Sequence, residues 1–352
     1  MNQIEIQSHP DFDDHELVRF ESNDAITAII AVHNSNLGTA MGGCRMFPYA
    51  CHRDALTDVL RLSRGMTYKS ALAGLPLGGG KSVIIADPAK NKSRKLFLAM
   101  GDFIDSMGGR YITAEDSGTG VDDITIVGER TRFISGVNPE DRFGGDPSPL
   151  TAYGVFVGIR EAVAYRCCSD LNNIRVAIQG VGNVGYHLAK LLVEAGARVV
   201  VADINQANLA RACALPGVIA VSIDEIISVE VDVLAPCAMG GAVNENSVSK
   251  IRAGIVAGAA NNQLLSPAMG SALLDRGILY APDYVINAGG IIHVFHQQGA
   301  ERSLARINHH IEKIGHSLHD IFRASDLSRI PTNEVADEMA EAIFRNGLEE
   351  VA

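Results

Sequence analysis

A glycine-rich motif between two apolar segments sets the strongest limit on how this chain can fold. Residues 180–185 read Gly-Val-Gly-Asn-Val-Gly, after an apolar run at 174–178 and before a helical pattern at 184–195. A second apolar run, 199–202, delivers Asp203 eighteen residues after the last glycine of the motif. Strand, glycine turn, helix, strand and acid in this order predict a β-α-β unit of the Rossmann type.

This unit predicts a binding site for a dinucleotide. Small residues let the backbone approach a pyrophosphate, and the helix start offers free N–H groups and the positive end of the helix dipole. Asp203 can accept hydrogen bonds from ribose hydroxyls and would repel a 2′-phosphate, which favours NAD over NADP. A glycine turn without a ligand is the alternative, but such a turn would not need the surrounding elements. The predicted cofactor-binding residues of this unit are Gly180, Gly182, Asn183, Val184, Gly185 and Asp203.

Three further strands, at 232–235, 255–259 and 278–281, extend the expected sheet. Each ends in polar or small residues, and ligands of an open parallel sheet lie beyond the carboxyl ends of its strands. Asn262 and Asn287 are the polar candidates near these ends, with loop capping as the alternative.

The segment 65–87 carries Lys69 and Lys81 among apolar and glycine residues. Desolvation lowers the pKa of an amine towards the range in which it can accept a proton at neutral pH. The glycines before Lys81 resemble a P-loop, but Gly74 and Gly80 are separated by five residues, and a strand expected at 83–86 follows instead of a helix. We therefore reject a P-loop, while a glycine turn with a solvated lysine stays open.

Two acids lie where a short strand at 111–113 runs into the loop 114–119. Such an acid is commonly a turn or cap residue. Asp116 becomes a candidate for proton transfer if one of the two lysines faces it.

The composition fits a compact globular protein of two domains. The chain has 352 residues, of which 47% are hydrophobic and 20% charged. A formal net charge of −11 without a basic run argues against a nucleic-acid partner. Neither an export signal nor an apolar run of membrane-spanning length occurs, so we expect a cytoplasmic protein. Six cysteines without a C-x-x-C pair and eleven histidines without ligand spacing predict neither disulfides nor a metal site.

Glycine and proline cluster at 143–149, which marks the expected domain boundary and hinge. We expect an α/β domain at 1–142, a doubly wound Rossmann domain at 143–325, and C-terminal helices at 326–352 that return to the first domain.

The motifs together resemble the family of glutamate, leucine, phenylalanine and valine dehydrogenases over nearly the whole chain. They are residues 42–46 (GGCRM), 66–69 (MTYK), 77–81 (LGGGK), 113–116 (TAED), 147–152 (PSPLTA), 180–185, 259–262 (AANN) and 287–290 (NAGG). The resemblance implies NAD-dependent, reversible oxidative deamination of an L-amino acid to a 2-oxo acid and ammonium, by a homo-oligomer whose contacts come mainly from the first domain.

The resemblance also implies roles for individual residues. Lys69 would hold the substrate α-carboxylate, Lys81 would be the low-pKa amine that activates water, and Asp116 would take the proton of the amino group. Thr151 and Asn262 are expected at the nicotinamide. Further substrate contacts are expected from Gly42, Gly43, Met41, Ala114, Asn287, Ile291 and Val294.

The substrate side chain is expected to be apolar. Glutamate dehydrogenases carry a lysine near the paired glycines, where this chain has Met41, and Ile291 and Val294 extend an apolar wall. The leucine enzymes usually carry Leu at Met41, Val at Ile291 and Asn at His293. Leucine and its branched relatives are the expected substrates. Because flexible Met41 and Phe295 could accept a longer ring, phenylalanine or tryptophan is the alternative.

Two other classes of protein stay open at this point. A 2-hydroxy-acid dehydrogenase would prefer a histidine and carboxylate pair with an arginine for the substrate carboxylate. A cofactor-binding sensor without catalysis would not need both lysines and Asp116.

Overall fold

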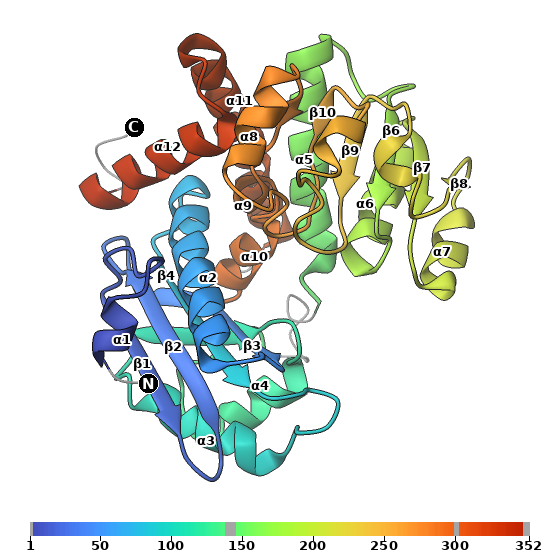
Figure 1. Cartoon of the computed structure of the whole chain (residues 1–352). Coiled ribbons are helices and arrows are strands. Elements are labelled where there is room, and N and C mark those ends of the chain that lie inside the picture. Colours follow the sequence, from blue (N-terminus) through green and yellow to red (C-terminus); the bar gives the residue numbers. More distant parts are fainter. Residues whose placement is uncertain (1–2, 138–145, 299–302, 348–352) are drawn as a thin grey trace. The chain divides into compact units, whose positions relative to one another are not determined.

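The computed structural model describes residues 3–137, 146–298 and 303–347, which belong to two compact units (Figure 1). Unit 1 contains Met1–Gly145, Gln297–Ala300 and Ala340–Ala352, and unit 2 contains Asp146–His296 and Glu301–Met339. The expected boundary at 142/143 and the first part of the expected hinge lie outside the described residues. The domain limits therefore stay a prediction.

Unit 1 is built on a five-stranded sheet of order β1-β2-β4-β3-β5. Its strands are β1 (Leu17–Ser22), β2 (Thr27–Asn34), β3 (Ala40–Phe47), β4 (Gly78–Ile85) and β5 (Tyr111–Glu115). β3 runs parallel to both β4 and β5, whereas β2 is antiparallel to β1 and β4. The carboxyl ends of β3, β4 and β5 consequently lie at the same edge of the sheet.

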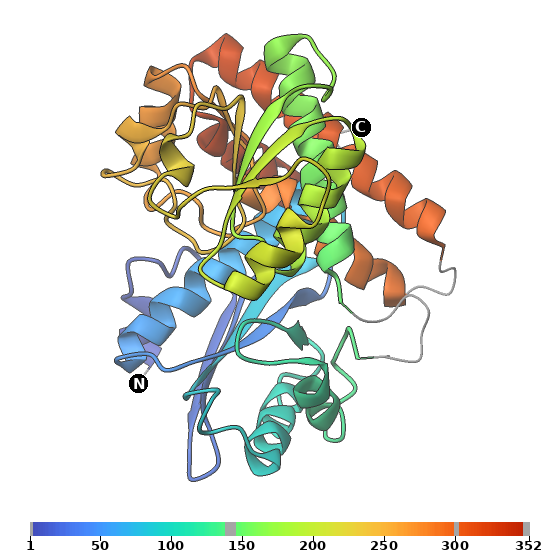
Figure 2. The ribbon, with the colours of Figure 1, turned by 90° about the vertical axis from the view of Figure 1, so that its right-hand side faces the viewer.

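Helices cover both faces of this sheet (Figures 1 and 2). They are α1 (Gln3–Gln7), α2 (His52–Leu72), α3 (Arg94–Asp105) and α4 (Val121–Val127). Ile29 and Val83 pack with Val59 and Leu60 of α2 in one core. The opposite core joins residues of β2, β3 and β4 to the apolar sides of α3 and α4.

Unit 2 holds a six-stranded sheet of order β11-β10-β9-β6-β7-β8 in which every pair is parallel. Its strands are β6 (Arg175–Gln179), β7 (Arg198–Ala202), β8 (Ile219–Ala220), β9 (Val233–Pro236), β10 (Ile255–Val256) and β11 (Leu279–Tyr280). The strand order turns back at β6, as in doubly wound folds. The expected fold of two α/β domains, the second of Rossmann type, is confirmed.

The helices of unit 2 are α5 (Ser148–Cys167), α6 (Asn183–Glu194), α7 (Gln206–Cys213), α8 (Ala268–Asp275), α9 (Asp283–Ile286), α10 (Gly289–Gln298) and α11 (Leu304–Ser328), with 3₁₀ turns η1 (Ile226–Ser228) and η2 (Val248–Lys250). The core on one face of the sheet joins β6, β7, β9 and β10 to η1 and α8. α5 packs against α6, β10 and α11.

The last helix, α12 (Thr332–Asn346), contributes to both units. Within unit 2, Asp337 accepts a hydrogen bond from the Tyr284 hydroxyl at 2.6 Å. Within unit 1, Glu341 accepts one from the Tyr68 hydroxyl at 2.8 Å. None of the helices in the described part of the chain is long and apolar enough to cross a membrane.

Candidate active site

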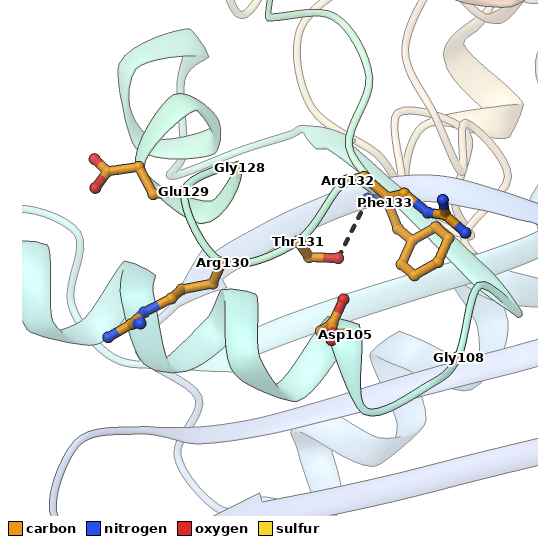
Figure 3. Close-up of a pocket in the computed structure, with 8 residues that line it drawn as sticks. All are labelled: Asp105, Gly108, Gly128, Glu129, Arg130, Thr131, Arg132 and Phe133. Atoms are coloured by element: carbon orange, nitrogen blue, oxygen red, sulfur yellow. Dashed lines mark hydrogen bonds between the residues drawn. The ribbon is translucent and has the colours of Figure 1, made fainter.

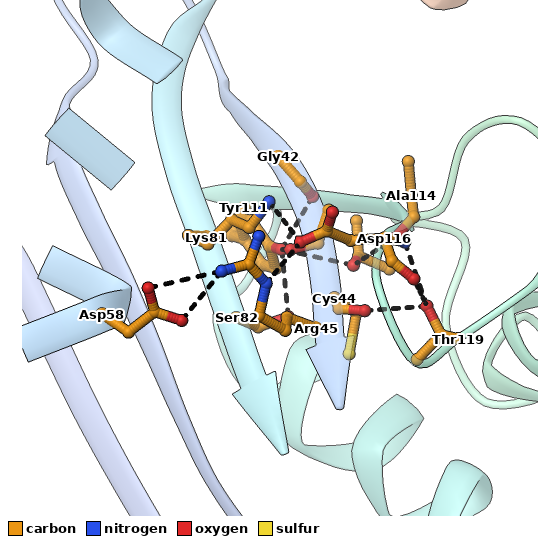
Figure 4. A network of polar contacts seen from close by, with 12 residues as sticks. Gly42, Cys44, Arg45, Asp58, Lys81, Ser82, Tyr111, Ala114, Asp116 and Thr119 are labelled. Atoms are coloured by element: carbon orange, nitrogen blue, oxygen red, sulfur yellow. Dashed lines mark hydrogen bonds and ion pairs between the residues drawn. The ribbon is translucent and has the colours of Figure 1, made fainter. Parts of the chain in front are cut away.

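An ion pair between Lys81 and Asp116 forms the centre of the site in unit 1 (Figure 4). Lys81 Nζ lies 2.7 Å from Asp116 Oδ2, and the two side chains are only 8% and 18% exposed. Lys81 is in β4 and Asp116 directly follows β5, so the strand order brings together residues 35 positions apart. Lys81 therefore faces Asp116, which is the condition under which Asp116 becomes a candidate for proton transfer.

Glycines allow the backbone to approach closely at this point. A Cβ atom at Gly43 would lie 2.7 Å from Cβ of Asp116, and one at Gly42 would lie 1.8 Å from the Gly80 carbonyl oxygen. The Tyr111 hydroxyl donates to the Gly42 carbonyl at 2.8 Å. Any larger residue at the two glycines of β3 would push β4 and the Asp116 loop apart.

The glycines before Lys81 lie inside β4, contrary to the expectation that the strand begins at 83. A Cβ atom at Gly79 would lie 2.2 Å from the Thr67 nitrogen, so α2 rests directly on this strand. Lys69 lies two residues after Thr67 on α2, and Lys81 lies two residues after Gly79 on β4. Lys81 is buried, which excludes the solvated-lysine alternative, and Lys69 is half-buried in the last turn of α2.

The charge of Asp116 is stabilised by two cations. Burial by itself would raise the pKa of the Asp116 carboxyl, but Lys81, then Arg45, and a hydrogen bond from the Ser117 backbone lower this pKa to about 2. Asp116 is thus ionised at neutral and alkaline pH, where it can stabilise a substrate cation.

The glycine motif of unit 2 forms a cradle between β6 and α6. Gly180 has φ +95°, and a Cβ atom at Gly185 would lie 2.0 Å from the Gly180 carbonyl oxygen. A Cβ atom at Gly182 would meet no described atom within 4 Å. Asn183 and Val184 open α6, whose N-cap residue makes no side-chain cap bond. Free N–H groups and an open approach fit the diphosphate of a dinucleotide.

Asp203 stands beside this cradle at the end of β7. Its two carboxylate oxygens accept hydrogen bonds from the backbone N–H groups of Val181, at 2.8 Å, and Asn205, at 2.7 Å. These bonds fix the carboxylate next to the glycine motif, a geometry that fits recognition of ribose hydroxyls.

A second polar group of unit 2 gathers around Asn287. The Asn287 amide donates to Ala259 O at 3.0 Å and to Asn261 Oδ1 at 2.8 Å, while its buried Oδ1 has no partner in the described structure. A Cβ atom at Gly290 would lie 2.7 Å from Thr151 Oγ1, so the paired glycines bring α10 close to Thr151. An orphaned, buried acceptor of this kind fits an N–H group of a ligand.

The other predicted site residues are distributed as follows. Met41 is 1% exposed in the core of unit 1, and Ala114 is half-buried in β5. Ile291 is buried and Val294 half-buried, one turn apart on α10. Asn262 is exposed, with φ +53°, next to Asn261.

A separate surface hollow of unit 1 contains none of the predicted site residues (Figure 3). It has a volume of about 600 Å³ and is lined by Asp105, Arg130, Arg132 and Phe133 among others. The described residues contain no cluster of three or more His, Cys, Asp or Glu side chains that could hold a metal ion.

Comparison with known proteins gives matches to two family models. Residues 16–133 match the Glu/Leu/Phe/Val dehydrogenase dimerisation domain, and residues 146–210 and 205–343 match the Glutamate/Leucine/Phenylalanine/Valine dehydrogenase model. The chain belongs to the Glu/Leu/Phe/Val dehydrogenase family. It is thus an amino acid dehydrogenase, an enzyme that deaminates an L-amino acid oxidatively with NAD or NADP.

Relatives within this family differ in substrate. Leucine dehydrogenase of Geobacillus stearothermophilus is 46% identical over 334 residues, which cover 93% of this chain and 90% of the relative. Phenylalanine dehydrogenase of Bacillus thermotolerans is 43% identical, covering 94% and 89%. The crystal structure of L-tryptophan dehydrogenase from Nostoc punctiforme matches with a TM-score of 0.82 and 40% identity, covering 95% of this chain and 96% of that one.

These matches confirm the expected reaction class and leave the substrate side chain undecided. They also exclude the hydroxy-acid dehydrogenase, because the family acts on CH–NH₂ groups. The match of unit 1 to a dimerisation domain indicates a homo-oligomer.

Two arginines near these sites had no role predicted from the sequence. Arg45 belongs to the motif at 42–46, and its guanidinium contacts Asp116 and Asp58. Arg211 lies near the cradle, where it donates to Gly182 O at 3.3 Å and stacks on the Tyr186 ring at 4.2 Å. Both arginines reach their partners from other elements, so no short motif could have linked them.

Proposed function

We propose that the protein is an NAD-dependent dehydrogenase of apolar L-amino acids, with leucine and its branched relatives as preferred substrates. The observation that carries the proposal is the 2.7 Å pair of buried Lys81 and half-buried Asp116 beside the close-packed glycines of β3. It supplies an amine and a carboxylate at one point, as proton transfer to and from an amino acid requires.

Within this proposal, Lys69 binds the substrate α-carboxylate, assisted by the backbone of Gly42 and Gly43. Asp116 is ionised at neutral and alkaline pH, and in this proposal it takes a proton from the substrate amino group. After the α-hydrogen has left as hydride, Lys81 removes a proton from the water that attacks the imine carbon. Asp116 then returns its proton to the carbinolamine nitrogen, the C–N bond breaks, and the hydroxyl proton passes to the departing ammonia, which gives the 2-oxo acid and ammonium.

NAD would be held by Gly180, Gly182, Asn183, Val184 and Gly185 at its diphosphate and by Asp203 at its ribose. Its contribution when bound is to accept the hydride. Thr151, Asn262 and the orphaned Oδ1 of Asn287 would orient the nicotinamide and the substrate. The negative charge of Asp203 supports NAD over NADP, because a 2′-phosphate would be repelled.

The preference for an apolar side chain rests on Met41, Ile291 and Val294. None of these residues can pair with a second carboxylate, so glutamate would lose its side-chain partner. Ala114 adds only a methyl group at the end of β5. One methylene of an apolar substrate changes discrimination by about 1 to 3 kcal/mol, so we expect a graded preference among aliphatic substrates.

An aromatic substrate is the second candidate. The similarity to phenylalanine and tryptophan dehydrogenases supports it. An unbranched methionine at position 41 can adapt to a ring more readily than a branched residue.

The test is a substrate panel. NADH formation is followed by absorbance at about pH 10, where the amino groups of substrates are increasingly neutral. The panel contains leucine, valine, isoleucine, phenylalanine, tryptophan and glutamate, each with NAD and with NADP. The highest kcat/KM with leucine and NAD supports the proposal; a lead for phenylalanine or tryptophan supports the second candidate, and a lead for glutamate contradicts both.

A further inference from the structure

A chain of polar contacts continues from Asp116 through Arg45 to Asp58 (Figure 4). Arg45 Nε donates to Asp116 Oδ2 at 3.2 Å. Arg45 Nη1 donates to both carboxylate oxygens of Asp58, at 3.3 and 3.0 Å. The Tyr49 hydroxyl donates to Asp58 Oδ2 at 2.5 Å. One guanidinium therefore bridges two carboxylates, and the second carboxylate is itself held by a phenol.

We propose that Arg45 and Asp58 are positioning residues that fix the Asp116 carboxylate through Oδ2 and so orient it to take the proton of the substrate amine. The inference rests on the role proposed above for Asp116. Lys81 and Arg45 both contact the same oxygen, Oδ2, and the Ser117 backbone N–H also donates to this carboxylate. These contacts restrict rotation of the carboxylate, which is then presented in one orientation.

The bridge also connects the proton acceptor to the helix that carries Lys69. Arg45 is in β3, Asp116 follows β5, and Asp58 is in the second turn of α2. Lys69 lies eleven residues further along the same helix. Asp58 thus holds the acid and the residue proposed for the substrate carboxylate in a fixed relation.

The contacts are unlike those of an ordinary surface ion pair. Arg45, Asp58 and Asp116 are 18%, 27% and 18% exposed, and a planar guanidinium fixes carboxylates in direction as well as in distance. Fully exposed pairs contribute little, because water and salt screen them.

The charges of this group balance. Lys81 from β4 and Arg45 from β3 are cations, and Asp116 after β5 and Asp58 from α2 are anions. Glu115 adjoins Asp116 in β5. Among the neighbouring weak acids, burial raises the pKa of Cys44 to about 12, with Asp123 of α4 also acting on Cys44, and burial and Asp58 raise the pKa of Tyr49 well above its usual value.

Removing the charge of Asp58 and removing the charge of Arg45 should consequently change the net charge of the site in opposite directions. Asp58→Asn leaves one extra positive charge beside Lys81 and Asp116, whereas Arg45→Gln leaves one extra negative charge. A positive charge favours loss of protons, so the acid limb of the pH profile of kcat/KM should move to lower pH in Asp58→Asn. It should move to higher pH in Arg45→Gln.

The experiment compares these two variants with Tyr49→Phe and Arg45→Lys, using the full-length enzyme with the best substrate of the panel. We expect kcat to fall about 10- to 100-fold in Asp58→Asn and Arg45→Gln, as for a misplaced reacting group. The KM for NAD should not change, and the acid limbs should shift in opposite directions by about 0.5 to 1 pH unit. In Tyr49→Phe the acid limb should shift less, in the same direction as in Arg45→Gln, because loss of the phenol donor leaves more of the Asp58 charge uncompensated. Arg45→Lys keeps the positive charge, so its acid limb should lie at the parent pH, while its kcat should be only part of the parent value.

A matched control is Arg61→Gln. Arg61 is an exposed residue of α2 and forms a 3.0 Å ion pair with Asp11, so its removal should leave the pH profile of the parent unchanged. Parent-like rates and limbs in both bridge variants, or limbs that shift in the same direction, would overturn the inference. Should Arg45→Gln fail to fold, the isosteric Asp58→Asn decides alone. Asp116→Asn distinguishes failure of the proposed function from failure of this inference. Parent-like turnover in Asp116→Asn refutes the proposed role of Asp116. An inactive Asp116→Asn together with parent-like Asp58→Asn and Arg45→Gln refutes only the positioning role of Arg45 and Asp58.

Discussion

The two units present their candidate sites in different ways. In unit 1 the chemistry depends on charged side chains that hold one another, because Lys81, Asp116 and Arg45 meet at a single oxygen atom. In unit 2 the candidate cofactor site consists mainly of backbone N–H groups and of space left by glycines, with Asp203 as its fixed carboxylate. Loss of a charge should therefore impair the reaction in unit 1, whereas added bulk should impair cofactor binding in unit 2.

Lys81→Ala should have the largest effect and tests the first half of this contrast. Loss of the proposed base should lower kcat by about 10³-fold or more, at the upper end of what a proton-transfer group contributes. Affinity for NADH, measured by fluorescence titration, should stay at the parent value because the cofactor cradle is in unit 2. Lys90→Ala, which removes a 78% exposed lysine of unit 1, is the control. Parent turnover in Lys81→Ala would show that another group is the base.

Gly182→Ala tests the second half. The added methyl group meets no described protein atom within 4 Å, so the melting temperature should stay near that of the parent. The methyl group would occupy the space through which the diphosphate approaches, and we expect the KM for NAD to rise about 10- to 100-fold, equivalent to about 1.4 to 2.8 kcal/mol. Steady-state kinetics with NAD as the varied substrate measures this change. An unchanged KM would mean that the diphosphate does not bind at the glycine motif.

Asp203→Asn should have a smaller effect on the same unit. Without the negative charge, repulsion of a 2′-phosphate is lost, and the ratio of kcat/KM for NAD to that for NADP should fall about 10-fold. One amide oxygen can still accept from Val181 or Asn205, so the turn should persist. Activity with each cofactor at a fixed amino acid concentration gives the ratio. A ratio equal to that of the parent would assign cofactor choice to another residue.

The smallest effect concerns the stability of unit 1. Burial, and then the neighbouring His15, lowers the pKa of His33 to about 4. Because this pKa is below the unfolded value, folding favours the neutral ring, and the resulting stability is complete above about pH 6.5 and declines as the pH falls towards 4. The unfolding free energy of the parent falls as the pH is lowered from about 7 to about 5. In His33→Gln this fall should be smaller by about 1 to 2 kcal/mol, because the variant has no imidazole to protonate.

Denaturant titrations at both pH values measure this difference. His52→Gln, an exposed histidine on α2, is the control and should behave as the parent. An equal decline in the parent and in His33→Gln would assign the pH dependence to other groups.

The sequence predicted the elements whose patterns are local. The order of strand, glycine motif, helix and Asp203 was correct to within about a residue at each end of α6, and the resemblance gave the family. The start of β4 was predicted five residues too late, because Gly78 to Gly80 resemble a turn until α2 is seen to rest on Gly79. Helix α4 was not predicted, since seven residues after a glycine loop give too short a pattern.

The contacts between elements could not be predicted in the same way. Arg45 and Asp58 are thirteen residues apart, on a strand and a helix, and only the packing of α2 brings them together. From the sequence, Asp116 was a candidate for proton transfer only if a lysine faced it. The parallel arrangement of β3, β4 and β5 brings Lys81 to that position.

The close packing at β3 and β4 has a consequence for altering the enzyme. At Gly42, Gly43 and Gly79 a single added carbon would come within 1.8, 2.7 and 2.1 Å of neighbouring atoms. Random mutagenesis of these positions should yield almost exclusively inactive clones. Libraries aimed at new amino acid substrates should instead vary Ile291 and Val294, the side chains of α10 proposed to contact the substrate, because a helix surface can change its side chains without moving β3 and β4.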